Sequence, residues 1–463
     1  MVFYRRIPKV LLQVLLPHGI SSCFSSLMEG SDLPRRQLRV LDLINCHIEY
    51  DKADGALVDW ISKFPETHNC LESLSFECVP NDVNINSLES LIARSPNLCR
   101  LRVNPCISIG QLCRLLLLAP QLTHLGTGAF YTHGNENVEM EVKDVTAIFG
   151  SMKELISLSG SSDIKPELLP AILPVCVQLK ELYLNHTVIF AEQLKPVIYG
   201  CHNLQIFWAL HTIGDEGLKA VAATCKGLQE IRIFPRNFRV EPEVFVSDHG
   251  LIYISEGCRK LRLIEYNCQL MTNAAMKAMS VNCPDLIVFH LYIMDCHRPD
   301  HSTGDPMDEG FAAIVMNCKK LHCLAVSGLL TDQAFELIGK YGKSIRTLSV
   351  AFSRNSDLVL NYVLEGCHNL QKLEIRKSPF GDAGLLAGVG HFNNMRFIWL
   401  NSCSLTVRGC REVARRLTNM VVEVIGGPFD ISPFYDDDPV EKFYMYQSLA
   451  GVRDDAPQFV EIL

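Results

Sequence analysis

Residues 225–233 read Cys-Lys-Gly-Leu-Gln-Glu-Ile-Arg-Ile, and this stretch decides the fold. Its spacing is C-x-x-L-x-x-L-x-L, with isoleucine at the last two apolar positions. The same spacing begins at other cysteines, namely Cys176, Cys201, Cys258, Cys283, Cys318 and Cys367. Cys176, Cys201 and Cys225 are 25 and 24 residues apart, so the chain is built from a short repeat.

Helical segments separate these strand segments. Residues 215–225 open with Asp-Glu and then carry apolar residues at helical spacing, and residues 308–314 and 331–338 follow the same pattern. Each repeat is therefore a strand followed by a helix, with the period of roughly 20 to 29 residues that leucine-rich repeats have. Weaker copies begin at Leu38, Leu71, Leu98, Leu122, Leu155, Ile345, Met395 and Met420.

We predict an α/β leucine-rich-repeat solenoid, a horseshoe with parallel strands on its concave side and helices outside. The predicted array covers residues 38–425, after a non-repeat N-terminal segment (1–37) and before a C-terminal cap (426–463). Three insertions interrupt the period, at 126–142, 234–250 and 292–310. Such loops either overhang a binding face or are tolerated passively at the surface, and both interpretations stay open.

Side chains alternate between the two faces of a strand, so the leucines of L-x-x-L-x-L point into the core and the residue between the last two points out. This rule predicts a row of side chains on the concave face, and we expect function there. Its members are Asp42, Ser75, Arg102, Arg232, Glu265, His290, Ala325, Ser349, Glu374 and Trp399.

Composition narrows the classes of function. The chain has 463 residues and a net charge of −8, so it has no broad basic surface for nucleic acid or an anionic membrane. Its 19 cysteines are an odd number, and many occupy one repeat position, which indicates buried, reduced thiols rather than disulfides. No apolar run reaches the roughly 18 residues of a membrane helix.

No constellation of residues indicates catalysis or a metal. Cys296, His297, Asp300 and His301 are close in sequence, but Pro299 prevents a helical presentation of the two histidines. We find no phosphate loop, nucleophile elbow or paired carboxylates, so we expect neither an enzyme nor a metal site. Arg232 in the row either holds an anion or is solvated or paired, and the second is the commoner outcome.

Several motifs together resemble one family, the auxin-receptor F-box proteins of plants (the transport inhibitor response and auxin signaling F-box proteins). These motifs are Phe207-Trp-Ala-Leu210, Met271-Thr-Asn-Ala-Ala275, Arg298-Pro-Asp-His301, Ser327-Gly-Leu-Leu-Thr-Asp332 and Leu373-Glu-Ile-Arg376. The tail, ending in Ala456-Pro-Gln-Phe459-Val460, is similar to the picloram-responsive branch. In that family an F-box docks on a Skp-type adaptor of an SCF ubiquitin ligase, and the repeats present Aux/IAA repressors, with auxin between receptor and degron.

The resemblance assigns a hormone pocket to His290, Leu291, Ala325, Ser349 and Asn267. His290 stands where the family has the arginine that grips the auxin carboxylate, and Asn267 stands where it has a phenylalanine. Arginine is always charged and bidentate, whereas an unperturbed histidine titrates near about pH 6.5. We therefore expect weak auxin binding.

The resemblance also implies a site for inositol hexakisphosphate. Arg232, Arg396, His297 and Arg298 would hold it, whereas Val288, His322, Cys323 and Gln371 fill positions that are arginine in relatives. We expect a thinned site, because a highly charged anion needs several cations.

The start of the sequence bears on the adaptor. An F-box takes roughly 40 to 50 residues, more than the 37 that precede the first predicted repeat, so docking of a Skp-type adaptor through these residues is in doubt. We predict a nuclear, non-catalytic substrate receptor weakened as a hormone receptor, either a diverged paralogue or an incomplete gene model. The alternative is a protein-interaction scaffold or decoy without ligase activity.

Overall fold

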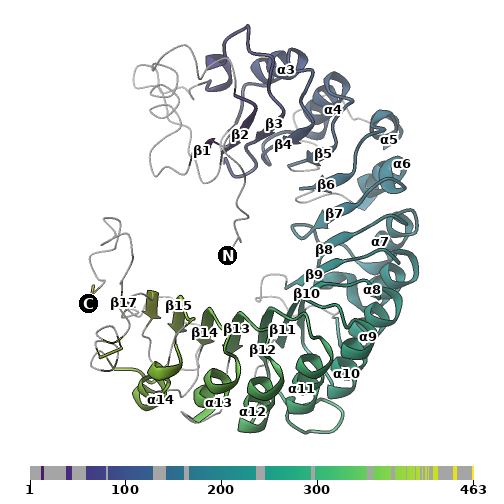
Figure 1. Ribbon diagram of the computed structural model, residues 1–463. Coiled ribbons are helices and arrows are strands. Elements are labelled where there is room, and N and C mark those ends of the chain that lie inside the picture. Colours follow the sequence, from purple (N-terminus) through teal and green to yellow (C-terminus); the bar gives the residue numbers. More distant parts are fainter. Residues whose placement is uncertain are drawn as a thin grey trace. The chain divides into compact units, whose positions relative to one another are not determined.

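The computed structural model is a leucine-rich-repeat solenoid in which strands and helices alternate along the chain (Figure 1). It describes residues 12–14, 38–43, 59–79, 82–128, 142–160, 166–235, 246–293, 298–351, 358–376, 381–392, 394–401, 403–406, 409, 412–413, 416, 421–425, 442–445 and 461–462. The chain divides into two units, residues 1–212 with 224–227 and residues 213–223 with 228–463.

The first unit pairs its strands in parallel in chain order. They are β1 (Leu12–Val14), β2 (Val40–Leu43), β3 (Ser73–Ser75), β4 (Arg100–Arg102), β5 (His124–Gly126), β6 (Ser157–Ser159), β7 (Glu181–Leu184) and β8 (Ile206–Leu210). The helices between them are η1 (Ile61–Lys63), α3 (Ile85–Ala93), α4 (Ile109–Leu118), α5 (Val142–Ser151), η2 (Pro166–Ile172), α6 (Leu173–Cys176) and α7 (Ala191–Ile198). Because β1 pairs with β2, the sheet begins one strand before the predicted array.

The second unit continues the same plan after η3 (His211–Ile213), which lies at the division. Its strands are β9 (Glu230–Phe234), β10 (Leu263–Cys268), β11 (Val288–Ile293), β12 (Cys323–Ser327), β13 (Thr347–Ala351), β14 (Lys372–Arg376), β15 (Phe397–Asn401), β16 (Val421–Ile425), β17 (Lys442–Met445) and β18 (Glu461–Ile462). Its helices are α8 (Gly214–Thr224), α9 (Asp248–Gly257), α10 (Asn273–Asn282), α11 (Asp308–Asn317), α12 (Asp332–Tyr341), α13 (Leu358–Gly366), α14 (Asp382–Ala387) and η4 (Gly388–His391). The pairing of β16 with β17 is antiparallel, whereas β9 to β16 pair in parallel.

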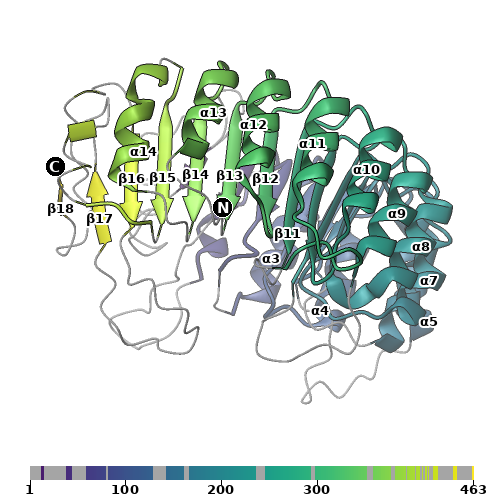
Figure 2. The same cartoon turned by 90° about the horizontal axis from the view of Figure 1, so that it is seen from below.

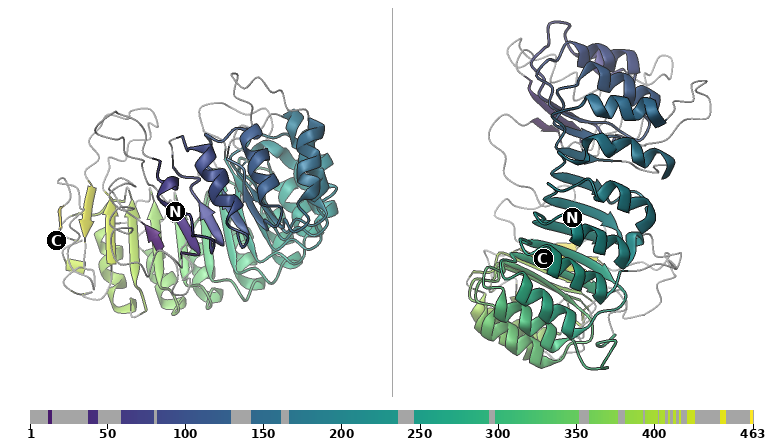
Figure 3. Two further views of the ribbon diagram at one scale, coloured as in Figure 1. Left: turned by 90° about the horizontal axis from the view of Figure 1, so that it is seen from above. Right: turned by 90° about the vertical axis from the view of Figure 1, so that its right-hand side faces the viewer.

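Each unit has two layers. In the second unit, α9 to α13 lie on one side of β10 to β14 (Figures 1 and 2). In the first unit, coloured purple to teal, the helices likewise lie along one side of the strands (Figure 3). We call the other side of each sheet its open face. Exposure alternates along β10, where the core-facing residues Ile264, Tyr266 and Cys268 are at most 1 % exposed.

Cysteines form hydrogen bonds between successive repeats. The C-cap residues of helices α9, α10 and α11 are Cys258, Cys283 and Cys318. The thiol of Cys283 donates to the carbonyl of Cys258 at 3.7 Å, and the thiol of Cys318 donates to the carbonyl of Cys283 at 3.6 Å. Burial raises the pKa of Cys283 and of Cys318 to about 12. Cys283 and Cys318 are thus buried, protonated thiols, as the sequence predicts for the repeat cysteines.

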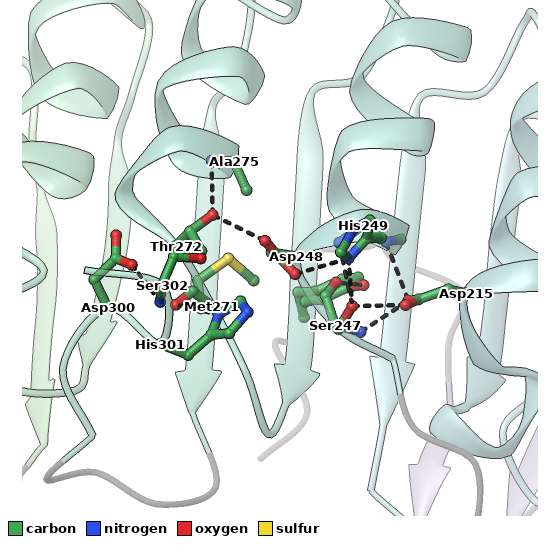
Figure 4. A network of polar contacts seen from close by, with 12 residues as sticks. Asp215, Ser247, Asp248, His249, Met271, Thr272, Ala275, Asp300, His301 and Ser302 are labelled. Atoms are coloured by element: carbon green, nitrogen blue, oxygen red, sulfur yellow. Dashed lines mark hydrogen bonds and ion pairs between the residues drawn. The ribbon is translucent and has the colours of Figure 1, made fainter. Parts of the chain in front are cut away.

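Aspartates make a second set of contacts between repeats. Asp215, near the start of α8, accepts from the backbone N–H of Ser247 at 2.8 Å and from its hydroxyl at 2.6 Å (Figure 4). Asp308 receives the same two bonds from Thr331. Each carboxylate therefore satisfies a backbone donor of the next repeat at the loop before its helix.

Candidate functional site on the open face of the second unit

Strand register aligns one residue of each strand from β9 to β15 into what we call the central row. Its members are Arg232, Glu265, His290, Ala325, Ser349, Glu374 and Trp399. These residues are neighbours in the order that the repeat spacing predicts. In the first unit, the predicted residues Asp42, Ser75 and Arg102 are likewise aligned.

Arg232 is held between two carboxylates. Its Nε donates to Oε1 of Glu230 at 2.8 Å, and its Nη1 donates to Oε2 of Glu265 at 3.0 Å. All three side chains are largely buried, at 26, 21 and 18 % exposure. Charge-assisted bonds of this kind are strong, so an incoming anion meets a guanidinium whose charge two carboxylates already offset. Of the two interpretations of Arg232, the structure shows the paired one.

His290 lies next to Glu265 and Ala325 in the row. Burial lowers the pKa of His290 to about 4, with a further contribution from the positive charge of Arg232 that outweighs the opposite effect of Glu374. The ring also meets Tyr292 edge-on, with centroids 6.2 Å apart. At neutral pH the imidazole is therefore uncharged and offers one N–H donor and no cation.

A second charged cluster ends the row. Glu374 accepts from Nζ of Lys372 at 2.6 Å, and its side chain is 12 % exposed. The guanidinium of Arg376 lies 3.9 Å from the other oxygen of Glu374 and stacks 4.7 Å from the centroid of the Trp399 ring. This arrangement places an aromatic surface covered by a cation on the open face.

The remaining predicted pocket residues do not all reach the open face. Ala325 and Ser349 occupy the central row but are only 1 and 8 % exposed. Asn267 donates from Nδ2 to the carbonyl of Ile233 at 2.8 Å, so its amide is tied to the neighbouring strand. Leu291 follows His290 along β11 and is fully buried in the core, so its side chain does not reach the open face. The period of two in a strand forces that orientation.

The predicted polyphosphate residues are spread over several elements. Arg396 is exposed just before β15, and Arg298 is exposed in the loop after β11. Arg232 is paired as described, and His297 lies outside the described residues.

Neither a metal site nor a membrane helix is found in the described part of the chain. No group of three or more His, Cys, Asp and Glu side chains there is arranged to hold a metal ion. Asp300 instead accepts from the backbone N–H groups of Asn273, Ser302 and Thr303. Burial alone would raise the pKa of this carboxyl, but these bonds lower it. None of the described helices combines the length and the apolar character needed to span a bilayer.

The sequence analysis missed four row residues in the first unit: Gly126, Ser159, Tyr183 and Trp208. They align with the row on β5 to β8. The repeat spacing would have found them, because the open-face residue keeps a fixed position in C-x-x-L-x-x-L-x-L, between the last two apolar residues. Gly126 and Ser159 follow from the first leucines Leu122 and Leu155, and Tyr183 and Trp208 follow from Cys176 and Cys201.

Comparison with known proteins identifies the class. The chain is 54 % identical to F-box protein FBX14 of Arabidopsis thaliana over 92 % of this chain and 68 % of that protein. It is 40 % identical to GRR1-like protein 1 of Arabidopsis thaliana over 92 % of this chain and 71 % of that protein. It is 43 % identical to the transport inhibitor response 1-like protein Os11g0515500 of Oryza sativa subsp. japonica over 90 % of this chain and 74 % of that protein.

Two other comparisons say less. No family model matches the chain. Among solved structures, the yeast Rad7 and Elc1 complex is similar with a TM-score of 0.48 and 15 % identity, over 73 % of this chain and 78 % of that one.

The repeat fold and these relatives define a leucine-rich-repeat substrate receptor of the F-box class. Within that class, the chain belongs to the auxin-receptor-like F-box family, as its motifs indicate.

Proposed function

We propose that this chain is a non-catalytic, nuclear substrate receptor that holds Aux/IAA-type degron peptides on the open face of the second unit for an SCF ubiquitin ligase. The central row supports this proposal, because strand register aligns the polar or aromatic side chains of Arg232, Glu265, His290, Glu374 and Trp399 within one row of seven neighbouring strands. Inositol hexakisphosphate would bind weakly beside it, and a Skp-type adaptor would connect the receptor to the ligase.

The weak response to auxin in this proposal depends on one observation, the uncharged state of His290 at neutral pH. A hormone carboxylate that enters the row meets an uncharged imidazole and an arginine already bound to Glu230 and Glu265. Losing a charged partner for a buried carboxylate costs about 2 to 5 kcal/mol. We therefore propose that auxin adds little to degron capture by this chain.

The same observation favours a second candidate function, a protein-interaction scaffold that binds peptides without hormone and without a ligase. Co-precipitation with a Skp-type adaptor separates the two candidates. Capture of the adaptor by the full chain supports the ligase receptor, and absence of capture supports the scaffold.

The hormone proposal is tested by capture of a biotinylated degron peptide with and without auxin. We expect little effect of auxin on the unmodified chain and a rise of about 5- to 100-fold in auxin-dependent capture for His290→Arg. The matched control is His249→Arg, which adds the same charge at a side chain that is 68 % exposed. Strong auxin dependence of the unmodified chain, or an equal gain in the control, would refute the role of His290.

A further inference from the structure

A hollow of about 480 Å³ lies on the open face of the first unit. Its lining includes Glu77, Arg102, Gly128, Ser159, Tyr183 and Trp208, all of which belong to that unit. This volume is in the range of binding pockets, roughly 300 to 1,000 Å³. None of these residues belongs to the central row of the second unit.

Three small residues, Gly128, Ser159 and Gly160, line part of the hollow. Gly126 and Ser159 are aligned neighbours on β5 and β6, between Arg102 on β4 and the aromatic residues farther along the sheet. Gly128 and Gly160 follow these two strands with φ of 63° and 88°. A Cβ atom on Gly160 would lie 2.7 Å from the backbone nitrogen of Thr127, so this part of the hollow has no room for a side chain there.

One wall is aromatic. Tyr183 and Trp208 are aligned on β7 and β8, and their rings meet edge-on with centroids 4.8 Å apart. The hydroxyl of Tyr183 donates to Oε2 of Glu181 at 3.2 Å, which fixes the direction of its ring. Both side chains are partly exposed. A rigid, half-exposed aromatic pair is a typical anchor for an aromatic or proline side chain.

The opposite wall is cationic. The stem of Arg102 lies over Gly126, because a Cβ atom on that glycine would be 2.9 Å from Cγ of Arg102. Arg102 therefore leans from β4 across β5 toward the hollow. Its ion pair with Glu77 is 3.3 Å long, and both side chains are about two-fifths exposed, at 43 and 40 %. Such solvated pairs are weak and yield to a better-placed carboxylate.

A second arginine lies close to this wall. Arg100 precedes Arg102 on the same face of β4, because the buried Leu101 separates them. Burial lowers the pKa of His124 on β5, the charges of Arg100 and Arg102 lower it further, and the charge of Glu181 acts in the opposite direction. The β4 and β5 end of the hollow thus favours an anion.

The distance between the walls selects the kind of ligand. Neighbouring strands are about 4.8 Å apart, so the backbones of β4, which carries Arg102, and β7, which carries Tyr183, are separated by roughly 14 Å. An extended peptide covers that distance in about four residues, at roughly 3.3 Å per residue. A lone aromatic acid is shorter than this separation of the two strands.

We propose that the first unit binds an extended peptide across β4 to β8, with an acidic side chain on Arg102 and an aromatic or proline side chain on Trp208 and Tyr183. This second peptide site is distinct in its residues from the degron surface proposed above. Its specificity comes from the spacing of about four residues between the acid and the ring.

The test uses the full chain and a fluorescein-labelled pentapeptide with aspartate first, tryptophan last and serine and glycine between them. We expect saturable fluorescence polarisation. Asparagine in place of the peptide aspartate, or alanine in place of the tryptophan, should weaken binding at least about fivefold, and Trp208→Ala should do the same. Trp399→Ala is the matched control, because it removes an open-face tryptophan of the second unit.

A charge swap keeps the test decisive even if Trp208→Ala fails to fold. Arg102→Glu should lower affinity for the aspartate peptide at least about tenfold and should raise affinity for the same peptide with lysine first. Equal loss of both peptides, or loss in Trp399→Ala alone, would overturn the proposal. So would a free aromatic acid that competes as well as the pentapeptide.

Discussion

Arg232 on β9 and Glu265 on β10 form an ion pair across neighbouring strands, with Nη1 and Oε2 3.0 Å apart. The same guanidinium also donates to Glu230 two residues earlier on its own strand. The arginine assigned by resemblance to an anion site is thus already neutralised by two carboxylates of the open face. An anion that binds here competes with the protein itself.

The first prediction concerns that competition. Glu265→Gln removes one carboxylate beside Arg232 and should raise the affinity for inositol hexakisphosphate by about 5- to 30-fold at physiological ionic strength. Isothermal titration calorimetry of the purified chain measures the change. Glu309→Gln is the control, because it changes the net charge equally at an exposed residue of α11. Equal affinities for the two variants would mean that Arg232 does not contact the polyphosphate.

The second prediction follows from His290. Its pKa is about 4 in the folded protein and about 6.5 in an unfolded chain, so the unfolded state binds more protons between these values. The stability that depends on neutral His290 is complete above about pH 6.5 and is lost as the pH falls toward 4. The loss should amount to roughly 1 to 3 kcal/mol.

Urea unfolding between pH 7.5 and 4.5 tests this effect. His290→Gln should flatten the decline of the unfolding midpoint with falling pH, because glutamine does not titrate in this range. His368→Gln, at an exposed position, should leave the decline unchanged. If both variants behave like the unmodified chain, another group controls the acid sensitivity.

The third prediction concerns the aspartate contacts between repeats. Asp308→Ala leaves a backbone N–H and a hydroxyl of Thr331 without their acceptor at a site where Asp308 is 6 % exposed. The expected cost is about 2 to 4 kcal/mol of unfolding free energy. Thermal melts followed by circular dichroism would show it. Asp285→Ala breaks a solvent-exposed contact with Lys320 and should leave the melting temperature unchanged. A similar drop in both variants would contradict the structural role of Asp308.

The fourth prediction concerns two helices that pack through glycine. A Cβ atom on Gly339 in α12 would overlap the carbonyl oxygen of Tyr362 in α13, so Gly339→Ala must push these helices apart. Overpacking of this kind costs about 1 to 3 kcal/mol. Hydrogen exchange should become faster in α12 and α13. Gly390→Ala, where a Cβ atom would meet nothing within 4 Å, should exchange like the unmodified chain.

Most of the fold was predictable, because the regular spacing of apolar residues in the repeat shows which strand side chains face the core. The spacing at Cys225 alone places Arg232 on the open face and Ile231 in the core, and the structure agrees. The same rule places Leu291 in the core, whereas the resemblance assigns it to the pocket.

The ion pairs and pKa values of the site were harder to predict from the sequence. The predicted row puts Arg232 beside Glu265, but the second partner, Glu230, lies two residues away on the same face and was not considered. The pKa of His290 depends mainly on burial by residues far apart in sequence, which periodicity does not report. The bond from Asn267 to Ile233 depends on one side-chain rotamer.

The cysteines that join successive repeats can serve as probes of local unfolding in the solenoid. A maleimide reagent reacts with an accessible thiolate, and the thiols of Cys283 and Cys318 are both shielded and protonated in the intact fold. Each thiol becomes reactive only while the repeat that contains it is locally unfolded. Pulse labelling followed by peptide mass mapping would therefore reveal the order in which the repeats unfold.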